Sequence, residues 1–88
     1  MSIDVKIVPA DVQDAVEKAT RYCELHAGPG TSFSYAVSYL KALDFSLMTY
    51  GVDGYKTQLL YVLCNLGSWR GTEAQEAKKV MSRFAESA

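Results

Sequence analysis

The sequence holds few residues with reactive side chains: one histidine and two cysteines. Cys23 and His26 lie three residues apart, so a helix would place them on one face, and Cys64 could complete a three-ligand zinc site. The chain has no closely paired cysteines and no second histidine, which zinc sites normally have. Cys23 also lies among expected core positions, whereas a thiol nucleophile must be exposed. The spacing therefore favours packed side chains and predicts neither a metal site nor a catalytic residue.

A lone carboxylate and a glycine-rich turn are the other candidates for chemistry. Asp44 falls within the apolar arc of its expected helix, where a buried carboxylate could act as an acid or base. A local ion pair with Lys41, or a cap at a helix break, is the favoured interpretation. The segment Gly28-Pro29-Gly30-Thr31 precedes a helix whose free amides could bind an anion, but it lacks the lysine and spacing of a phosphate-binding loop. We therefore expect no cofactor and no enzymatic activity.

Length and charge exclude several classes of protein. A chain of 88 residues and 9.7 kDa forms one domain, and 49% hydrophobic residues are typical of a globular fold. A net charge of −1 argues against nucleic acid or an anionic membrane as partner. There is no apolar run long enough to span a membrane and no signal-peptide pattern. With only two cysteines, a reduced cytoplasmic protein is expected.

Charged and aromatic residues are distributed unevenly along the chain. The segment from Thr31 to Trp69 carries only four charged residues. The same segment holds eight of the ten aromatic residues, namely Phe33, Tyr35, Tyr39, Phe45, Tyr50, Tyr55, Tyr61 and Trp69. The two ends of the chain hold most of the charge. The sequence therefore predicts an apolar, tyrosine-rich centre flanked by charged, solvated segments.

The first ten residues show a pattern unlike the rest of the chain. Ile3, Val5 and Ile7 alternate with polar residues, which predicts a short strand or extended arm over residues 1–10, ended by Pro9. No second strand is evident downstream, so a strand would have to pair with its copy in another subunit.

Four helices are expected in the remainder of this single domain, 1–88. Their predicted ranges are 11–27, 32–50, 54–66 and 72–87. Asp11 and Asp53 are the expected N-caps of the first and third helices, and either Thr31 or Ser32 is expected to cap the second. The segment Thr72-Glu73-Ala74-Gln75 fits a capping box for the fourth. Because short loops favour antiparallel neighbours, we predict an all-α fold, a small antiparallel helical bundle of about four helices.

The tyrosines point to a binding role. Six tyrosines exceed what the core of a small domain satisfies, because each hydroxyl needs a partner or water. Tyrosine, tryptophan and arginine are enriched at protein interfaces. The expected partner-binding residues are Tyr35, Tyr39, Tyr61, Trp69 and Arg70. We expect a non-enzymatic helical protein-binding module, a homodimer, that acts as a regulator or inhibitor by binding another protein, as small accessory proteins of phages and mobile elements do.

Two other functions fit parts of the pattern. A dimeric ribbon–helix–helix DNA-binding regulator has the order of one strand and then two helices, with Ser2, Asp4 and Lys6 facing the DNA. The charge of Asp4 and the acidity of the whole chain oppose this function. A helix-turn-helix at residues 58–84 is opposed by an overlong turn and by acidic residues at the start of its second helix. A small-ligand-binding protein with a pocket at a subunit interface would use tyrosine and tryptophan stacking together with Arg70.

Overall fold

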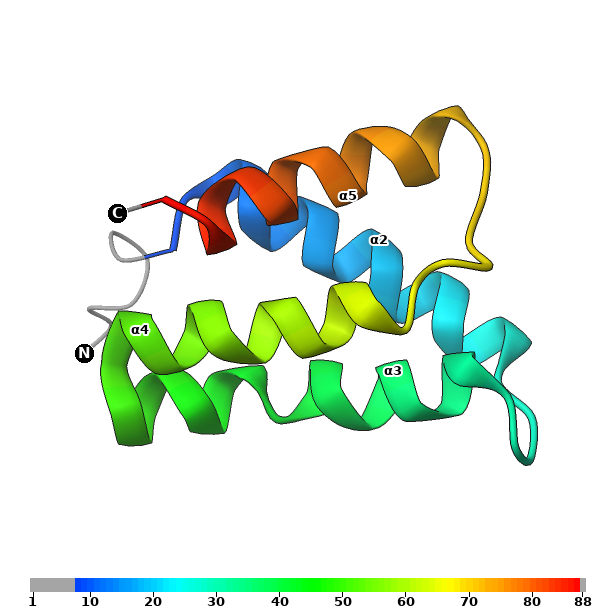
Figure 1. Ribbon diagram of the computed structural model, residues 1–88, viewed down its shortest axis with the longest axis horizontal. Helices are drawn as coiled ribbons and strands as arrows, with labels where there is room; N and C mark the ends of the chain where they lie inside the picture. The colour runs from blue at the N-terminus through cyan, green and yellow to red at the C-terminus, as the bar shows by residue number, and fades with distance from the viewer. Residues whose placement is uncertain (1–7, 88) are drawn as a thin grey trace.

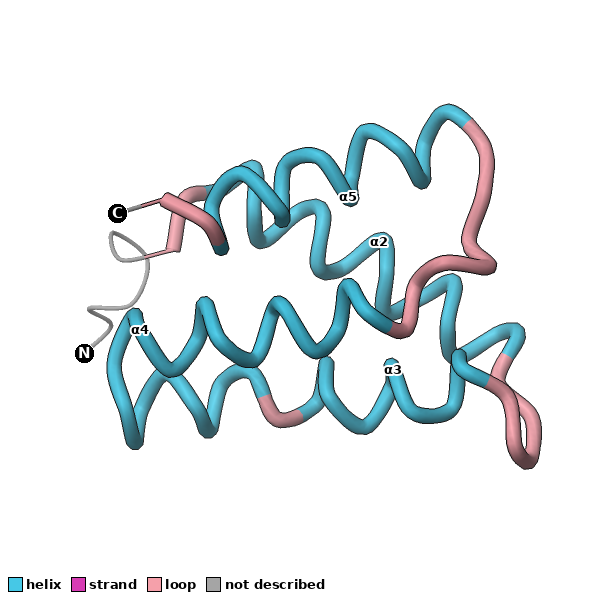
Figure 2. Tube along the Cα trace, in the orientation of Figure 1, coloured by secondary structure: helices cyan, strands magenta, loops and turns pink. Residues whose placement is uncertain are grey.

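The computed structural model describes residues 8–87, and this part of the chain is helical, with no strand (Figures 1 and 2). Its helices are α2 (Ala10–His26), α3 (Ser32–Lys41), α4 (Leu43–Cys64) and α5 (Thr72–Ala85). The predicted all-α arrangement of four helices is confirmed. The predicted strand or arm falls mainly on residues 1–7, which lie outside the described residues.

The helices pack in a ring, in which α2 contacts α3 and α5, and α4 contacts the same two helices. In Figure 1, α3 and the first part of α4 run in one direction, and the chain then reverses and returns alongside them. We call this unit, residues 32–64, the helical hairpin. The reversal occurs at Gly51, which has φ 78° and ψ −163° inside α4. Gly51 falls in the gap between the predicted helices 32–50 and 54–66, so the turn that this gap implies is confirmed.

The core lies between the hairpin and the other two helices. Its fully buried larger side chains are Leu59, Leu66, Met81, Val62 and Cys23. The buried positions of α2 and α5 are mostly alanine, and these small side chains allow close helix packing. The buried positions are Val12, Ala15, Ala19 and Cys23 on α2, and Ala74, Ala77, Met81 and Ala85 on α5.

The single helix predicted over residues 32–50 is interrupted at Ala42. This residue has φ −87° and ψ −2°, and its amide donates to the carbonyl of Tyr39, 3.2 Å away. The interruption rotates the following residues relative to a continuous helix. Asp44, predicted to lie in the apolar arc, is therefore exposed in the first turn of α4. The less favoured alternative, a buried carboxylate that acts as an acid or base, is therefore wrong. The favoured interpretation included a break in this helix, and the break is present, although Asp44 follows it in the first turn of α4 and does not cap it.

The caps show where local sequence rules hold and where they fail. The Thr31 hydroxyl accepts a hydrogen bond from the Ser34 amide at 3.3 Å, so Thr31, and not Ser32, is the N-cap of α3. The N-cap of α2 is Pro9 and not Asp11, which lies in the first helical turn, where its negative charge still favours the helix dipole. The capping box is not formed, because Gly71 occupies the N-cap position of α5 with φ 109°. Asp53 lies inside α4, two residues after Gly51.

Candidate protein-binding surface

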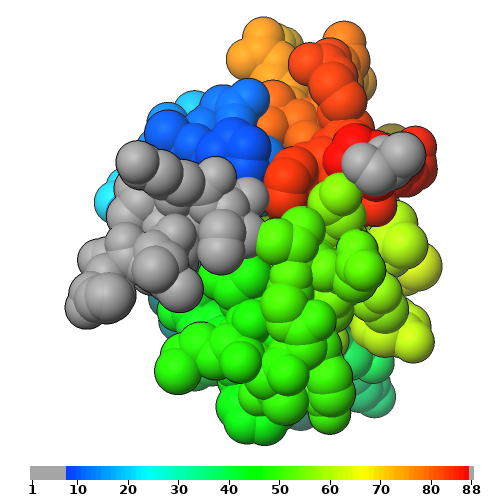
Figure 3. All heavy atoms as spheres, turned by 90° about the vertical axis from the view of Figure 1, so that its left-hand side faces the viewer, coloured from blue at the N-terminus to red at the C-terminus, as the bar shows by residue number. Residues whose placement is uncertain are grey.

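Large apolar side chains remain exposed mainly on the helical hairpin. Seven large hydrophobic residues are exposed in the described chain, and six of them belong to α3 and α4. We call these six the hairpin surface: Tyr35, Phe45, Met48, Tyr50, Leu60 and Tyr61. The seventh, Leu25, lies on α2. Figure 3 views the end at which the hairpin turns, where green atoms of α4 fill the lower half of the molecule.

A pair of tyrosines links the two arms of the hairpin. The rings of Tyr39 and Tyr61 stack with centroids 5.7 Å apart and an interplanar angle of 27°. The side-chain amide of Gln58 donates to the carbonyl of Tyr39 at 3.1 Å, beside the break between α3 and α4. Tyr35 lies one helical turn before Tyr39 and is more exposed. The structure thus gathers three of the five predicted partner-binding residues on one part of the fold.

The other two predicted partner-binding residues lie elsewhere. Trp69 is only 2% exposed and stacks on Tyr22 with centroids 5.4 Å apart. Tyr22 in turn contacts the rings of His26 and Phe33, so these aromatic side chains form one cluster. Arg70 is exposed in the loop before α5. Trp69 therefore belongs to the core, and Arg70 lies outside the helical hairpin, in the loop that follows it.

The candidate residues that the sequence did not identify are Phe45, Met48, Tyr50 and Leu60. On a continuous helix over 32–50, Met48 and Tyr50 fall in the apolar arc and so predict burial. The break at Ala42 and the turn at Gly51 leave them exposed instead. A signal for Phe45 was present, because it is the one aromatic residue within the polar strip of that helix.

The hairpin carries little charge, and part of it is engaged within the molecule. Its four charged residues are two lysines and two aspartates. The Lys56 ammonium lies 5.1 Å from the ring centroid of Phe84 and donates to the carbonyl of Ser87 at 3.1 Å, so it is directed toward α5. The exposed faces of α2 and α5 carry many charges, including the 2.7 Å ion pair of Arg21 with Glu17. The molecule therefore has one neutral, aromatic side and one charged side.

The reactive side chains do not form a catalytic or metal-binding group. Within residues 8–87, no three His, Cys, Asp or Glu side chains are grouped closely enough to hold a metal ion. Cys23 is buried, and burial raises the pKa of its thiol to about 11. Burial, with the nearby Asp44 charge as a second cause, raises the pKa of Tyr55 to about 12. His26 is exposed and stacks on Tyr22 with centroids 4.1 Å apart. The protein holds Cys23 and Tyr55 in their neutral forms at neutral pH.

The two cysteines are expected to differ sharply in reactivity. Only a thiolate attacks a disulfide reagent, and Cys64 is exposed whereas Cys23 is buried with a raised pKa. Titration of the native protein with a chromogenic disulfide should therefore detect one fast thiol, and unfolding in urea should release a second. Cys64→Ser should abolish the fast reaction and keep the slow one. Equal rates for both thiols in the native protein would contradict the burial of Cys23.

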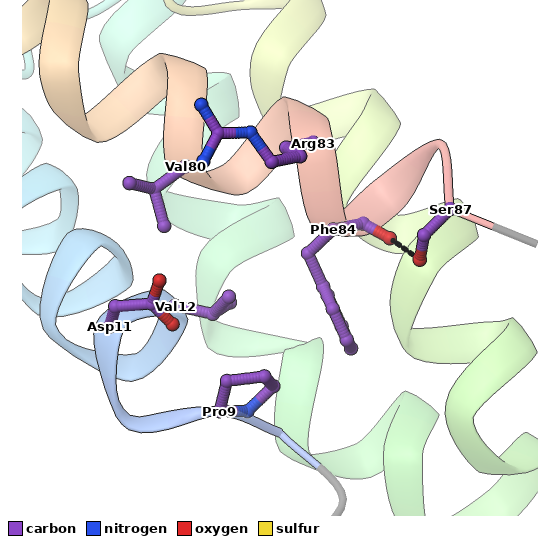
Figure 4. Close-up of a pocket in the computed structure, with 7 residues that line it drawn as sticks. All are labelled: Pro9, Asp11, Val12, Val80, Arg83, Phe84 and Ser87. Carbon is purple, nitrogen blue, oxygen red and sulfur yellow. Dashed lines mark hydrogen bonds between the residues drawn. The ribbon is translucent and has the colours of Figure 1, made fainter.

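Two surface hollows lie between α2 and α5. The first, of about 240 Å³, has an apolar lining of Pro9, Val12, Val80 and Phe84 beside Asp11 and Arg83 (Figure 4). The Ser87 hydroxyl at its edge donates to the carbonyl of Phe84 at 2.7 Å. The second, of about 180 Å³, is lined by four carboxylates, Lys18 and small apolar side chains. Neither hollow contains a cysteine, a histidine or a residue of the hairpin surface.

Among the described residues, the hairpin surface is therefore the best candidate for a binding site, because its side chains are apolar or aromatic and are also exposed. None of the helices within residues 8–87 combines the length and apolar character needed to cross a membrane. Comparisons with protein-family models, with curated proteins and with solved structures found no match to this chain.

Proposed function

We propose that this protein is a non-enzymatic helical protein-binding module that acts as a regulator or inhibitor, and that the hairpin surface is its binding surface. The observation that carries the proposal is the placement of six of the seven large exposed apolar side chains on α3 and α4. Burying such side chains against a partner is favourable, whereas leaving them in water is not. Their concentration on one hairpin is what a binding surface requires.

The size of the surface supports the proposal. If a fully exposed large side chain offers about 200 Å², the exposed parts of these six residues amount to roughly 700 Å². Stable protein interfaces bury about 800 Å² on each partner. The six side chains alone therefore approach the area that one side of a stable complex buries.

The residue types support it as well. Three of the six residues are tyrosines, whose rings supply large contact areas and whose hydroxyls can form hydrogen bonds at an interface rim. Met48, the most exposed of the six at 85%, has an unbranched side chain that adapts to a partner's shape. Aromatic residues and methionine are enriched at interfaces, whereas lysine and glutamate are depleted.

The experiment that tests this function is a comparison of binding by variants. Tagged wild-type protein, a Phe45→Glu/Tyr61→Glu variant and a Leu25→Glu control are each immobilised and exposed to an extract of the source cells. Because a buried charge opposes docking, proteins held by the wild type should be lost from the hairpin variant and retained by the control. Circular dichroism verifies that all three are folded. Identical sets of bound proteins on all three would contradict the proposal.

A further inference from the structure

We infer that the partner seated on the hairpin surface is a second copy of this chain, in a dimer with a twofold axis. This inference rests on the proposed function, since it names the occupant of the same surface. A twofold contact is isologous, so the same surface is used by both subunits and must complement itself. Charge, hydrogen-bonding capacity and area each bear on whether the hairpin surface can do so.

The distribution of charge favours a dimer in which two hairpins meet over a dimer in which the α2 and α5 sides of the two copies meet. A twofold axis brings each region close to its own copy, so a surface with charges of one sign repels itself. The hairpin carries only two lysines and two aspartates, and Lys56 is directed toward α5. By contrast, one hollow between α2 and α5 is lined by four carboxylates and by only one cation, Lys18, so acidic groups predominate there: Asp11, Asp14, Glu73 and Glu76. Self-contact at the α2 and α5 side would bring these carboxylates together, and self-contact at the hairpin avoids that repulsion.

Tyrosine is suited to contact with a copy of itself. A phenolic hydroxyl is both a hydrogen-bond donor and an acceptor, so two symmetry-related tyrosines can satisfy each other. Surfaces rich in carboxylates or ammonium groups lack this property, because each group acts only as acceptor or only as donor. Tyr35, Tyr50 and Tyr61 are each more than half exposed. If the hairpin packs against its copy, the hydroxyls of these tyrosines can therefore form hydrogen bonds with tyrosine hydroxyls of the other subunit.

The available area also fits a second copy. The roughly 700 Å² offered by the six side chains is close to the ~800 Å² per partner of a stable interface, and a twofold contact uses it twice. Two hairpins packed face to face would place helices against helices, for which ridge-into-groove packing provides ready geometries. A second hairpin is therefore large enough to cover the hairpin surface, and no other helix of the protein is needed for the contact.

The test is the mass of the protein in solution. Sedimentation and light scattering across micromolar concentrations should give twice the chain mass of 9.7 kDa. Met48→Glu and Tyr61→Glu should each weaken dimerisation by at least about tenfold, because each substitution would bury a charge without a partner in an apolar contact. Leu25→Glu is the matched control, since Leu25 is 81% exposed and Met48 is 85% exposed. This control should leave the dimer unchanged.

The outcomes separate this inference from the proposed function. A wild-type monomer at all concentrations overturns the inference, while loss of captured proteins from the hairpin variant would still support a binding module for other proteins. A dimer that survives both glutamate substitutions, or one that Leu25→Glu also dissociates, overturns the assignment of the hairpin surface. Wild-type dimers that dissociate only with the hairpin substitutions support it. Circular dichroism shows whether each variant is folded, and Met48→Gln provides an uncharged variant of the same exposed position.

Discussion

Replacing Trp69 with alanine is expected to lower the free energy of unfolding by about 3–5 kcal/mol, the usual cost of removing a buried tryptophan. Trp69 is only 2% exposed, and its ring stacks on Tyr22, which also contacts His26 and Phe33. These contacts join the end of α2, the start of α3 and the loop before α5. The loss can be measured by urea unfolding followed by circular dichroism, since Trp69 is the one tryptophan in the chain.

The neighbouring residue provides the control. Arg70 is exposed, so Arg70→Ala should change the unfolding free energy by no more than about 0.5 kcal/mol. A Trp69→Ala variant that keeps its stability but loses dimerisation or binding would instead identify Trp69 as an interface residue. If Trp69→Ala causes a large loss of stability and Arg70→Ala a negligible one, then Trp69 has a structural role, although the sequence predicts both residues as partner-binding.

The difference at Trp69 illustrates what a sequence cannot show about a loop. Residues in loops usually lie at the surface, and an aromatic residue between two glycines in a loop is therefore expected to face a partner. In the structure, the loop folds back so that Trp69 enters the core. The Lys78 ammonium then donates to the carbonyls of Leu66 and Trp69, at 3.0 and 2.7 Å. These contacts join residues nine to twelve positions apart in sequence, so no local pattern reports them.

The break at Ala42 has a similar origin. Alanine has the highest helix propensity, so the residue at the break does not itself predict an interruption, and only Asp44, two residues later, suggested one. The carbonyl of Tyr39 accepts hydrogen bonds from both the Ala42 amide and the Gln58 side chain. The second bond exists only when α4 returns alongside α3. The apolar periodicity was enough to predict the four-helix arrangement, but the exposure of Met48 depends on a tertiary contact that the periodicity does not contain.

The tyrosines of the hairpin were more predictable than its other exposed residues. Tyr35, Tyr39 and Tyr61 lie at the margins of apolar arcs on helical wheels, and margins become partly exposed wherever the helix packs on one side. Their placement depends only on helical periodicity, which the sequence contains. Tyr50 lies beside the turn at Gly51, where the wheel no longer describes the chain. The exposed positions of Tyr35 and Tyr61 could therefore be predicted from helical periodicity, whereas that of Tyr50, beside the turn, could not.

Replacing Gly54 with alanine is expected to lower the free energy of unfolding by about 1–3 kcal/mol, through overpacking at the point where the hairpin closes. A Cβ atom at Gly54 would overlap the Cβ of Tyr50 and lie 3.1 Å from the carbonyl oxygen of Ser46. Neither of these atoms is the free end of a flexible side chain, so the steric overlap can be removed only if the backbone moves. Since Tyr50 belongs to the hairpin surface, Gly54→Ala should also weaken dimerisation. Urea unfolding and sedimentation measure the two effects.

Two further glycines separate steric overlap from backbone conformation. A Cβ at Gly51 meets nothing within 4 Å, but φ 78° with ψ −163° is a conformation that essentially only glycine adopts, so Gly51→Ala should also cost about 1–3 kcal/mol. A Cβ at Gly67 likewise meets nothing within 4 Å, and Gly67 has no positive φ, so Gly67→Ala should be nearly neutral. If all three alanine variants were equally stable, the reversal of the chain would depend on neither the close contact at Gly54 nor the backbone conformation of Gly51. A cost at Gly54 and Gly51 alone would place the determinants of the hairpin, and of the surface it presents, at these two positions.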